Sequence, residues 1–201
     1  MLQEESKANV TNAPIIALGS NTSRAGAGPA ALLSAALRAL DGAGLPVAAT
    51  SRFYATPCFP AGSGPDYVNA AARLDTDRAP GEVLKILHRI EADFGRERRQ
   101  RWASRSLDLD LIAMGATILP DAATQRQWVD LPADRQKREA PDRLILPHPR
   151  LQDRAFVLIP MADIAPDWRH PVLGKTVRQM LDALPASEKT AIIALDRTRM
   201  C

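Results

Sequence analysis

The pattern of apolar and polar positions predicts an alternation of strands and helices from residue 14 onward. A short apolar run over residues 14–18, followed by Gly19-Ser20-Asn21, is typical of a buried strand that ends in a turn. Leucines and alanines at helical spacing predict a helix over residues 29–41. A second amphipathic pattern predicts a helix over residues 80–94 that is closed by Gly95.

Three further extended runs complete this pattern. Residues 47–55, which break at Thr56-Pro57, and residues 66–74 flank a loop rich in Gly and Pro, so we expect these two strands to pair. The run over residues 106–112 alternates strictly between polar and apolar side chains from Ser106 to Leu111, as a half-buried strand does. The resulting order β-α-β-β-α-β is typical of the α+β, ferredoxin-like fold, in which an antiparallel sheet carries helices packed on one face.

The ends of the chain add weaker patterns. Residues 1–13 are polar and predict a disordered leader, so we expect one domain over residues 14–201. Helical spacing over residues 152–164 and 175–184 predicts additional C-terminal helices, and residues 190–195 could form a small closing strand.

Residues 120–143 predict a surface insertion. The segment is polar and contains Pro132 and Pro141, and it could form one or two short helices around Trp128. We expect Trp128 to anchor it locally against the domain. Because loop-closure entropy grows slowly with length, replacing residues 121–142 with a short linker is expected to leave the reaction intact.

The strand over residues 106–112 carries the first candidate chemistry. Leu107, Leu109 and Leu111 fall on one face of the strand, and Asp108 and Asp110 fall on the other. Carboxylates two residues apart on a strand have Cβ atoms about 6 to 7 Å apart, so both can approach one or two hard cations. The alternative is that the two acids are simply the wet face of an edge strand.

Arginines concentrate immediately before this strand. Five of them fall within ten residues and are opposed only by Glu97; they are Arg96, Arg98, Arg99, Arg101 and Arg105. Guanidinium groups match phosphate oxygens in shape and charge, although an arginine run can also be a solvated surface. Together with a pair of acids for Mg²⁺, they favour a phosphoryl-transfer site.

Composition narrows the function classes. The chain of 201 residues is 46% hydrophobic and 24% charged, which is ordinary for a globular protein and excludes a fibrous class. A net charge of +3 that comes from one local cluster favours a small anionic ligand over a nucleic-acid coat. Cys58 and Cys201 offer no disulfide framework, and the sequence contains neither a secretory signal nor a membrane-length apolar run, so we expect a cytoplasmic protein.

Five ordered motifs carry a resemblance to a known family. They are Ala17-Leu-Gly-Ser-Asn21, Ser51-Arg-Phe-Tyr-Ala-Thr-Pro57, Pro65-Asp-Tyr-Val-Asn-Ala70, Arg101-Trp102 through Leu107-Asp-Leu-Asp110, and Leu146-Pro-His-Pro-Arg150 followed by Arg154-Ala-Phe156. Together they resemble 6-hydroxymethyl-7,8-dihydropterin pyrophosphokinase, also called 2-amino-4-hydroxy-6-hydroxymethyldihydropteridine diphosphokinase. Any one motif alone would be a weak signal.

The resemblance implies a transferase of folate biosynthesis that moves diphosphate from ATP to the pterin hydroxymethyl group and releases AMP. It assigns Asp108 and Asp110 as ligands of two Mg²⁺ ions and Arg96 and Arg105 as catalytic residues that neutralise developing charge. The positions that match ATP-binding residues of the family are His88, Glu91, Arg98, Arg101, Leu111, His148 and Arg154.

The resemblance also implies a pterin pocket. Its matching positions are Thr56, Pro57, Cys58, Tyr67, Asn69, Trp102 and Phe156. Tyr67 and Phe156 would stack on the flat ring and Asn69 would read its amide-like edge, while Trp102 closes the pocket against water. Residue type alone leaves other roles open, since Asn69 could cap a turn and the two aromatic residues could simply pack in a core.

The sequence departs from the usual family pattern at two places, and two alternative functions stay open. Cys58 stands where the family commonly has a second proline, and Ala103-Ser104 stands where it commonly has Gly-Pro, which bears on loop stiffness more than on the reaction. A non-catalytic RNA-binding module would share the fold, and an ordinary kinase would release ADP. The resemblance favours small-molecule partners, with no nucleic acid, no membrane and a monomeric state.

Overall fold

The computed structural model describes residues 12–24, 26–58, 64–95, 106–136 and 138–196. The predicted core elements are all present: β1 (Pro14–Ser20), α2 (Pro29–Gly42), β2 (Val47–Thr50), β3 (Tyr54–Thr56), β4 (Tyr67–Leu74), α3 (Pro80–Asp93) and β5 (Asp108–Met114). They are followed by α4 (Ala122–Val129), α5 (Ala133–Gln136), a 3-10 turn (Leu151–Asp153), α6 (Ala155–Ile164), α7 (Val177–Ala183), α8 (Ala186–Thr190) and β6 (Ile193–Ala194). The short helix α8 was not anticipated from the sequence.

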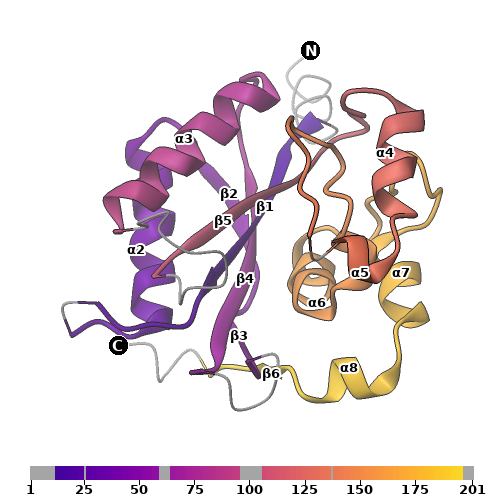
Figure 1. The fold of residues 1–201 in the computed structure, drawn as a ribbon. Coiled ribbons are helices and arrows are strands. Elements are labelled where there is room, and N and C mark those ends of the chain that lie inside the picture. The colour runs from indigo at the N-terminus through magenta and orange to yellow at the C-terminus, as the bar shows by residue number, and fades with distance from the viewer. Residues whose placement is uncertain (1–11, 25, 59–63, 96–105, 137, 197–201) are drawn as a thin grey trace.

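The strands form one antiparallel sheet in the order β5-β1-β4-β3-β6, and β2 also pairs with β4 (Figure 1). Helix α2 connects β1 to β2, which lie on opposite sides of β4. Helix α3 connects β4 to β5, which lie on opposite sides of β1. Strands joined by a helix are therefore not adjacent in the sheet. The α+β, ferredoxin-like β-α-β-β-α-β prediction is therefore confirmed.

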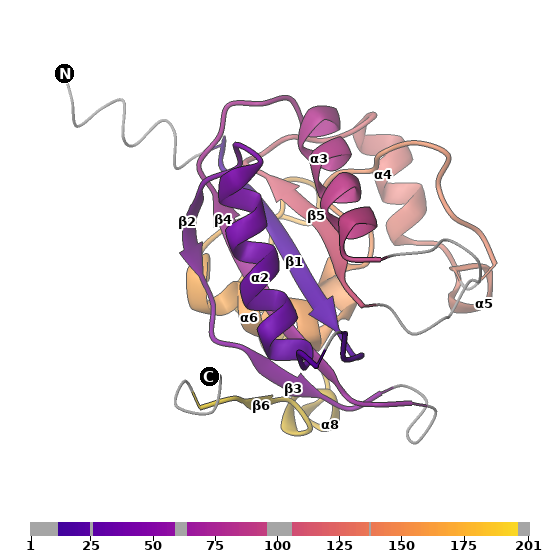
Figure 2. The same ribbon diagram turned by 90° about the vertical axis from the view of Figure 1, so that its left-hand side faces the viewer.

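Helices α2 and α3 cover one face of the sheet (Figure 2). They bury leucines at helical spacing, including Leu33, Leu40 and Leu87, against the side chains of Leu18 and Leu109. Burial of each leucine contributes about 1.5 to 3 kcal/mol, which makes this the main stabilising layer.

The opposite face is covered in part by α6 and α7, so the expectation that helices pack on one face only was incomplete. Val157 and Met161 of α6 and Met180 of α7 pack with Ile15 of β1 and Ala71 of β4. The physical reason is that β1 and β4 are apolar at successive positions, and such strands need cover on both faces.

The predicted strand over residues 47–55 is divided into β2 and β3, which differ in their partners. Between them, the backbone N–H of Arg52 donates to Asp163 Oδ2 of α6 over 3.0 Å, and the guanidinium forms two further bonds of 2.8 and 3.1 Å to the same carboxylate. The hydroxyl of Tyr54 also donates to Asp163 Oδ2 over 2.8 Å. These bonds attach the start of β3 and the residue before it to α6. They lie where the strand is interrupted between β2 and β3.

Ionisation of this group follows from the same contacts. Burial, together with the neighbouring Asp163, raises the pKa of Tyr54 to about 12. Burial alone would raise the pKa of Asp163, but hydrogen bonds from Arg52 and Tyr54 outweigh it and hold that pKa below its usual value. At neutral pH the carboxylate is therefore charged and the phenol is protonated, as the hydrogen bonds require.

Segment 120–143 leaves and re-enters the domain through paired flanks. Leu119 and Leu146 exchange backbone hydrogen bonds of 2.9 and 3.1 Å, which brings the two ends together. Within α4 the buried side chain is that of Gln125, whereas Trp128 is only half-buried. Gln125 is therefore a buried contact of this segment with the domain, and Trp128 as its anchor stays a prediction.

No helix among the described residues is long and apolar enough to cross a membrane.

A buried histidine near α7 gives the fold a pH dependence. His170 is fully buried, its Nδ1 accepts the backbone N–H groups of Val172 and Leu173, and burial lowers its pKa to about 4. In the unfolded chain the pKa is about 6.5, so between these values the unfolded state binds more protons. The free energy of unfolding should therefore fall as the pH drops from about 6.5 toward 4, by at most about 1.4 kcal/mol per pH unit for this residue.

Urea unfolding at several pH values in this window tests the prediction. We expect His170→Asn, which keeps an acceptor for the two N–H groups but does not titrate, to show a shallower loss of stability with acidity than the unmodified chain. Equal slopes for the two proteins would contradict it.

Candidate functional site

The site is built on the face of the sheet that α6 and α7 leave partly uncovered. Gly19 of β1 pairs with Asn69 of β4 on one side and with Asp108 of β5 on the other. Paired residues on adjacent strands point to the same face, and two strand spacings separate Asn69 from Asp108 by about 10 Å. The two predicted binding groups, one for a pterin edge and one for metal, therefore face each other across the central strand.

A second row repeats this arrangement one pleat further along. Ala17 of β1 pairs with Ala71 and with Asp110. Since the central strand contributes Gly19 and Ala17 between the carboxylates and β4, the surface between the carboxylates and Asn69 is flat. Asp108 and Asp110 are both half-buried, so they remain accessible from this face.

Gly19 is required for this packing. A Cβ at position 19 would lie 2.9 Å from Asn69 Oδ1, closer than real side chains approach. Asn69 is only 7% exposed and its Nδ2 donates to Thr56 Oγ1 over 3.0 Å, so it has little room to move aside. The sequence had suggested a turn at Gly19-Ser20-Asn21, but β1 continues through Ser20.

We therefore expect Gly19→Ala to displace the Asn69 carboxamide and raise the KM for the pterin substrate by roughly tenfold, because a misplaced binding group loses its hydrogen bond. The KM for nucleotide should change less. Steady-state kinetics with each substrate varied in turn measures both values.

Gly81→Ala is the matched control, since its added Cβ meets no described atom within 4 Å. A Gly19→Ala protein with unchanged pterin KM would show that Asn69 does not bind the pterin.

The other predicted pterin residues gather around Asn69. Thr56 of β3 pairs with Tyr67 of β4, which is half-buried on the Asn69 face. Pro57 is exposed, and the backbone N–H of the half-buried Cys58 donates to Asp66 Oδ1 over 3.1 Å. A neighbouring carboxylate thus stabilises this turn at a position where the family commonly has proline.

Phe156 and Arg154 lie at the start of α6. Phe156 is 36% exposed, and the Arg154 guanidinium carbon lies 5.6 Å from the centre of its ring. Such a cation–π contact holds the ring and the charge together. The ring is one of the few large apolar side chains that the described surface exposes, as expected for a stacking group rather than a core residue.

His148 is neutral at physiological pH. Burial, together with the positive charges of Arg154 and Arg150, lowers the pKa of His148 to about 3, against the opposing effect of Asp108. Its Nδ1 accepts the backbone N–H of Arg150 over 3.1 Å, which places the remaining ring proton on Nε2. His148 is therefore a hydrogen-bond donor close to the carboxylate of Asp108.

Arg150 was not predicted as a site residue. Its side chain is only 14% exposed, and its nearest ionic partner is Asp153 at 4.0 Å. Burial lowers the pKa of Arg150, and Arg154 acts in the same direction. With Arg154 it forms a positive region beside His148, which suits phosphate. The signal in the sequence was its place at the end of the motif Leu146-Pro-His-Pro-Arg150, two residues after His148.

Three predicted ATP-binding residues are not brought to the Asp108 face. Glu91 of α3 is 1% exposed, and its Oε1 accepts the backbone N–H of Leu109 over 2.8 Å at the open edge of β5. Leu111 is buried in the core under α2 and α3, so only its backbone could contact a ligand. His88 is exposed on α3. Glu91 thus supports the strand that carries the two aspartates.

The remaining predicted residues, Arg96, Arg98, Arg101, Trp102 and Arg105, lie outside the described residues.

The two aspartates fit Mg²⁺ as part of a metal–nucleotide site. Among the described residues, no group of three or more acidic, histidine or cysteine side chains could hold a metal by itself. Magnesium is commonly held by one or two carboxylates together with substrate phosphates and water. A pair of half-buried carboxylates on one face of the sheet matches that kind of site.

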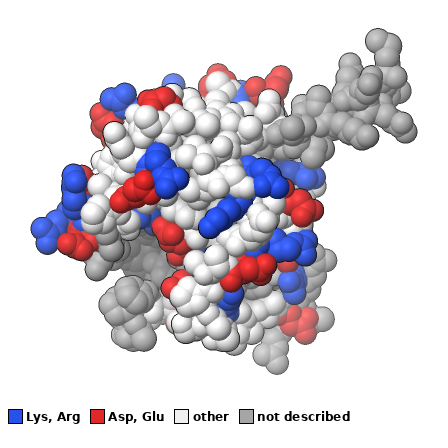
Figure 3. All heavy atoms as spheres, turned by 90° about the vertical axis from the view of Figure 1, so that its right-hand side faces the viewer, with Lys and Arg blue, Asp and Glu red and all other residues white. Residues whose placement is uncertain are grey.

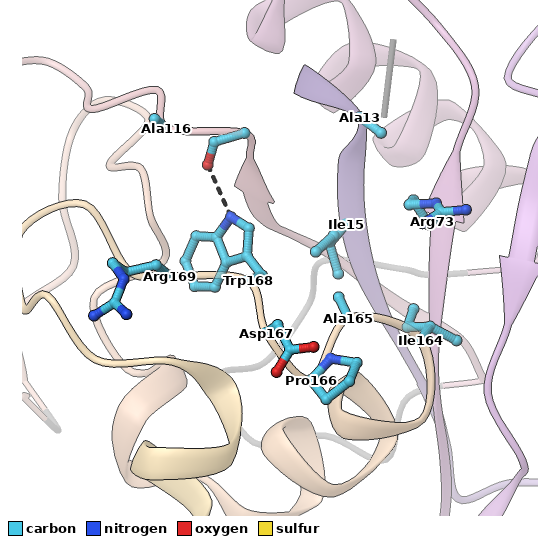
Figure 4. A pocket seen from close by; sticks show the side chains of 11 residues that line it. Ala13, Ile15, Arg73, Ala116, Ile164, Ala165, Pro166, Asp167, Trp168 and Arg169 are labelled. Atoms are coloured by element: carbon cyan, nitrogen blue, oxygen red, sulfur yellow. Dashed lines mark hydrogen bonds between the residues drawn. The ribbon is translucent and has the colours of Figure 1, made fainter. Parts of the chain in front are cut away.

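A cavity of about 540 Å³ lies elsewhere, at the opposite end of β1 from Gly19. Ile15, Arg73 and Trp168 line it, and the Trp168 Nε1–H donates to the Gly115 carbonyl over 2.9 Å (Figure 4). None of the predicted site residues that the structure describes lines this cavity.

Comparison with known proteins decides the family. Residues 15–166 match the family described as 7,8-dihydro-6-hydroxymethylpterin-pyrophosphokinase (HPPK). The chain belongs to the HPPK family. The resemblance seen in the five sequence motifs is thereby confirmed, and the protein is a pyrophosphokinase of folate synthesis.

Relatives named 2-amino-4-hydroxy-6-hydroxymethyldihydropteridine pyrophosphokinase match most of this HPPK chain. The protein of Pseudomonas aeruginosa is 39% identical over 85% of this chain and 90% of its own length. That of Haemophilus influenzae is 33% identical over 83% and 92%. The protein of Synechocystis sp. is 40% identical, and the match covers 70% of this chain and 61% of that protein.

Solved structures show the same fold. A crystal structure of Plasmodium falciparum HPPK-DHPS matches with a TM-score of 0.62 at 13% identity, over 90% of this chain and 46% of that one. An HPPK-DHPS structure in complex with substrates matches with a TM-score of 0.64 at 12% identity, over 92% and 46%. The HPPK chain thus spans just under half of these longer chains.

Proposed function

We propose that the enzyme transfers diphosphate from ATP to the hydroxymethyl group of 6-hydroxymethyl-7,8-dihydropterin and releases AMP. The observation that carries the proposal is the placement of Asn69 and Asp108 on opposite sides of Gly19 on one face of the sheet. A separation of about 10 Å leaves room for a pterin ring edge at Asn69 and a metal-bound diphosphate at Asp108.

In this proposal Asp108 and Asp110 hold Mg²⁺, in two ions, together with the phosphates of ATP. Bound Mg²⁺ supplies neutralisation of the phosphate charge and alignment for in-line attack by the hydroxymethyl oxygen on the β-phosphorus. The aspartates would act as ligands of the metal, and Glu91 keeps their strand in place through Leu109.

The nucleotide end would be bound by the basic region around α6. His148 donates from Nε2 as a neutral imidazole, and Arg154 and Arg150 supply positive charge to the phosphates. Arg96 and Arg105 are proposed to meet the charge that develops as AMP leaves, with Arg98 and Arg101 on the nucleotide and Trp102 closing the pocket.

The pterin ring would be bound by the amide of Asn69 and by two aromatic side chains. Asn69, held by its bond to Thr56, offers both a donor and an acceptor to the ring edge. Tyr67 and Phe156 would sandwich the ring.

The proposal keeps the prediction of a cytoplasmic monomer.

An RNA-binding module is less well supported. The strand face that such a module would use for stacking bases carries Asp108 and Asp110 here, and carboxylates repel phosphates unless a metal intervenes. On the side of the molecule that bears α4 to α7, acidic and basic residues are interspersed and form no continuous basic surface (Figure 3).

The test is a product analysis. The protein is incubated with ATP, Mg²⁺ and 6-hydroxymethyl-7,8-dihydropterin, and AMP is resolved from ADP. We expect AMP and a pterin diphosphate in equal amounts. Formation of ADP alone, as an ordinary kinase would give, or no turnover, would contradict the proposal.

A further inference from the structure

Helix α4 contacts the segment that carries His148 through one fully buried side chain. Gln125 is 0% exposed, and its Nε2 donates to the Pro147 carbonyl over 3.2 Å. Pro147 immediately precedes His148 in the chain. The helix belongs to segment 120–143, to which neither the sequence nor the family assignment gave a role.

A buried glutamine is an uncommon anchor for a short surface helix. The other described side chains of α4 are exposed or half-buried, so Gln125 is the buried contact of this helix with the domain. Its Oε1 is buried without a hydrogen-bond partner among the described residues. A leucine there would avoid the cost of burying an amide, so simple packing does not account for this residue.

The Pro147–His148 segment is held from two other directions. The His148 N–H donates to the Ile112 carbonyl of β5 over 2.8 Å, and Leu146 is paired with Leu119. These bonds fix the segment beside the metal strand but leave its outer side open. The Gln125 amide closes that side, because it binds the carbonyl between Leu146 and His148.

We infer that Gln125 is a positioning residue for His148, and that α4 is therefore part of the nucleotide site rather than a dispensable excursion. The contact fixes the peptide unit before His148, and thereby the direction in which its Nε2–H points. This inference rests on the proposed function, in which that N–H binds ATP. It reverses the expectation that a short linker could replace residues 121–142 without effect.

The experiment compares Gln125→Met with Gln127→Met in the full chain. The first removes the amide and keeps the length of the side chain, and the second makes the same change at an exposed position of α4. Binding of α,β-methylene-ATP with Mg²⁺, and separately of 6-hydroxymethylpterin, is measured by calorimetry. We expect Gln125→Met to weaken nucleotide binding on the order of tenfold, with pterin binding and the Gln127→Met protein unchanged.

A second background shows whether His148 carries the effect. In a His148→Ala protein, Gln125→Met should weaken nucleotide binding no further, because the group that it positions is gone. If Gln125→Met does not fold, Gln125→Asn, whose amide is one methylene short of Pro147, serves in the same comparison.

Three results would contradict the inference. Unchanged nucleotide affinity in a folded Gln125 variant, an equal loss in Gln127→Met, or an undiminished loss in the His148→Ala background would each do so. These results differ from failure of the proposed function, which would appear as no binding of α,β-methylene-ATP by the unmodified protein.

Discussion

Asp108→Ala and Asp110→Ala are each expected to reduce diphosphate transfer by roughly 10³-fold or more, because each removes a proposed ligand of the Mg²⁺ that would neutralise and align the phosphates. The fold should survive both changes. The two side chains are half-buried on the face away from the leucines of β5, so their removal leaves the core under α2 and α3 intact. AMP release at saturating Mg²⁺ and the thermal midpoint measure the two effects.

Two further variants test whether the loss of activity comes from the loss of the carboxylate at this site. Asp108→Asn keeps the size of the side chain and should be nearly as inactive, since an amide is a poorer ligand for Mg²⁺. Asp77→Ala changes an exposed aspartate outside the site and should be fully active. Near-normal turnover by either alanine variant at saturating Mg²⁺ would remove that residue from the metal site.

Arg96→Ala or Arg105→Ala is expected to lower kcat by roughly 10²-fold or more while changing the KM for ATP much less. The reason is that these guanidinium groups are proposed to meet charge that appears mainly in the transition state. Asn69→Ala should have the opposite signature, with a raised KM for the pterin and a smaller change in kcat. Steady-state kinetics with each substrate varied in turn separates the two patterns.

Arg126→Ala is a suitable control for charge removal, because Arg126 forms an exposed ion pair with Asp130 on α4. Exposed pairs contribute about 0 to 1 kcal/mol, so little change is expected. If the Arg96 and Arg105 variants altered only the KM for ATP, both arginines would be reassigned to ground-state nucleotide binding.

Much of the fold could be predicted because its signals are local. The alternation of Leu109 and Asp110 specifies a strand and its two faces, and the spacing of Leu33 and Leu40 specifies an amphipathic helix. The division of strand 47–55 could not be predicted, because it depends on bonds between Arg52 and Asp163, which are 111 residues apart. The C-terminal helices were predicted, but their packing on the second face of the sheet was not, because helical spacing alone does not say which surface a helix covers.

The candidate site also has residues that the sequence could indicate and residues that it could not. Family motifs predicted that Asn69 and Asp108 belong to one site, and the sheet register puts both beside Gly19 on one face, while their binding roles stay predictions. Glu91 and Leu111 carry no sequence signal that distinguishes a ligand contact from burial. Gln125 could not be found either, because a glutamine in a polar helix is normally exposed, and only its distance from Pro147 shows otherwise.

A crystal structure of the protein with α,β-methylene-ATP, Mg²⁺ and 6-hydroxymethylpterin tests the central claim most directly. We predict Mg²⁺ within about 2.0 to 2.1 Å of oxygens of Asp108 and Asp110, the pterin edge on Asn69, and the hydroxymethyl oxygen aimed at the β-phosphorus across Gly19. A pterin or metal bound away from this face of the sheet, for instance in the cavity beside Trp168, would contradict the account.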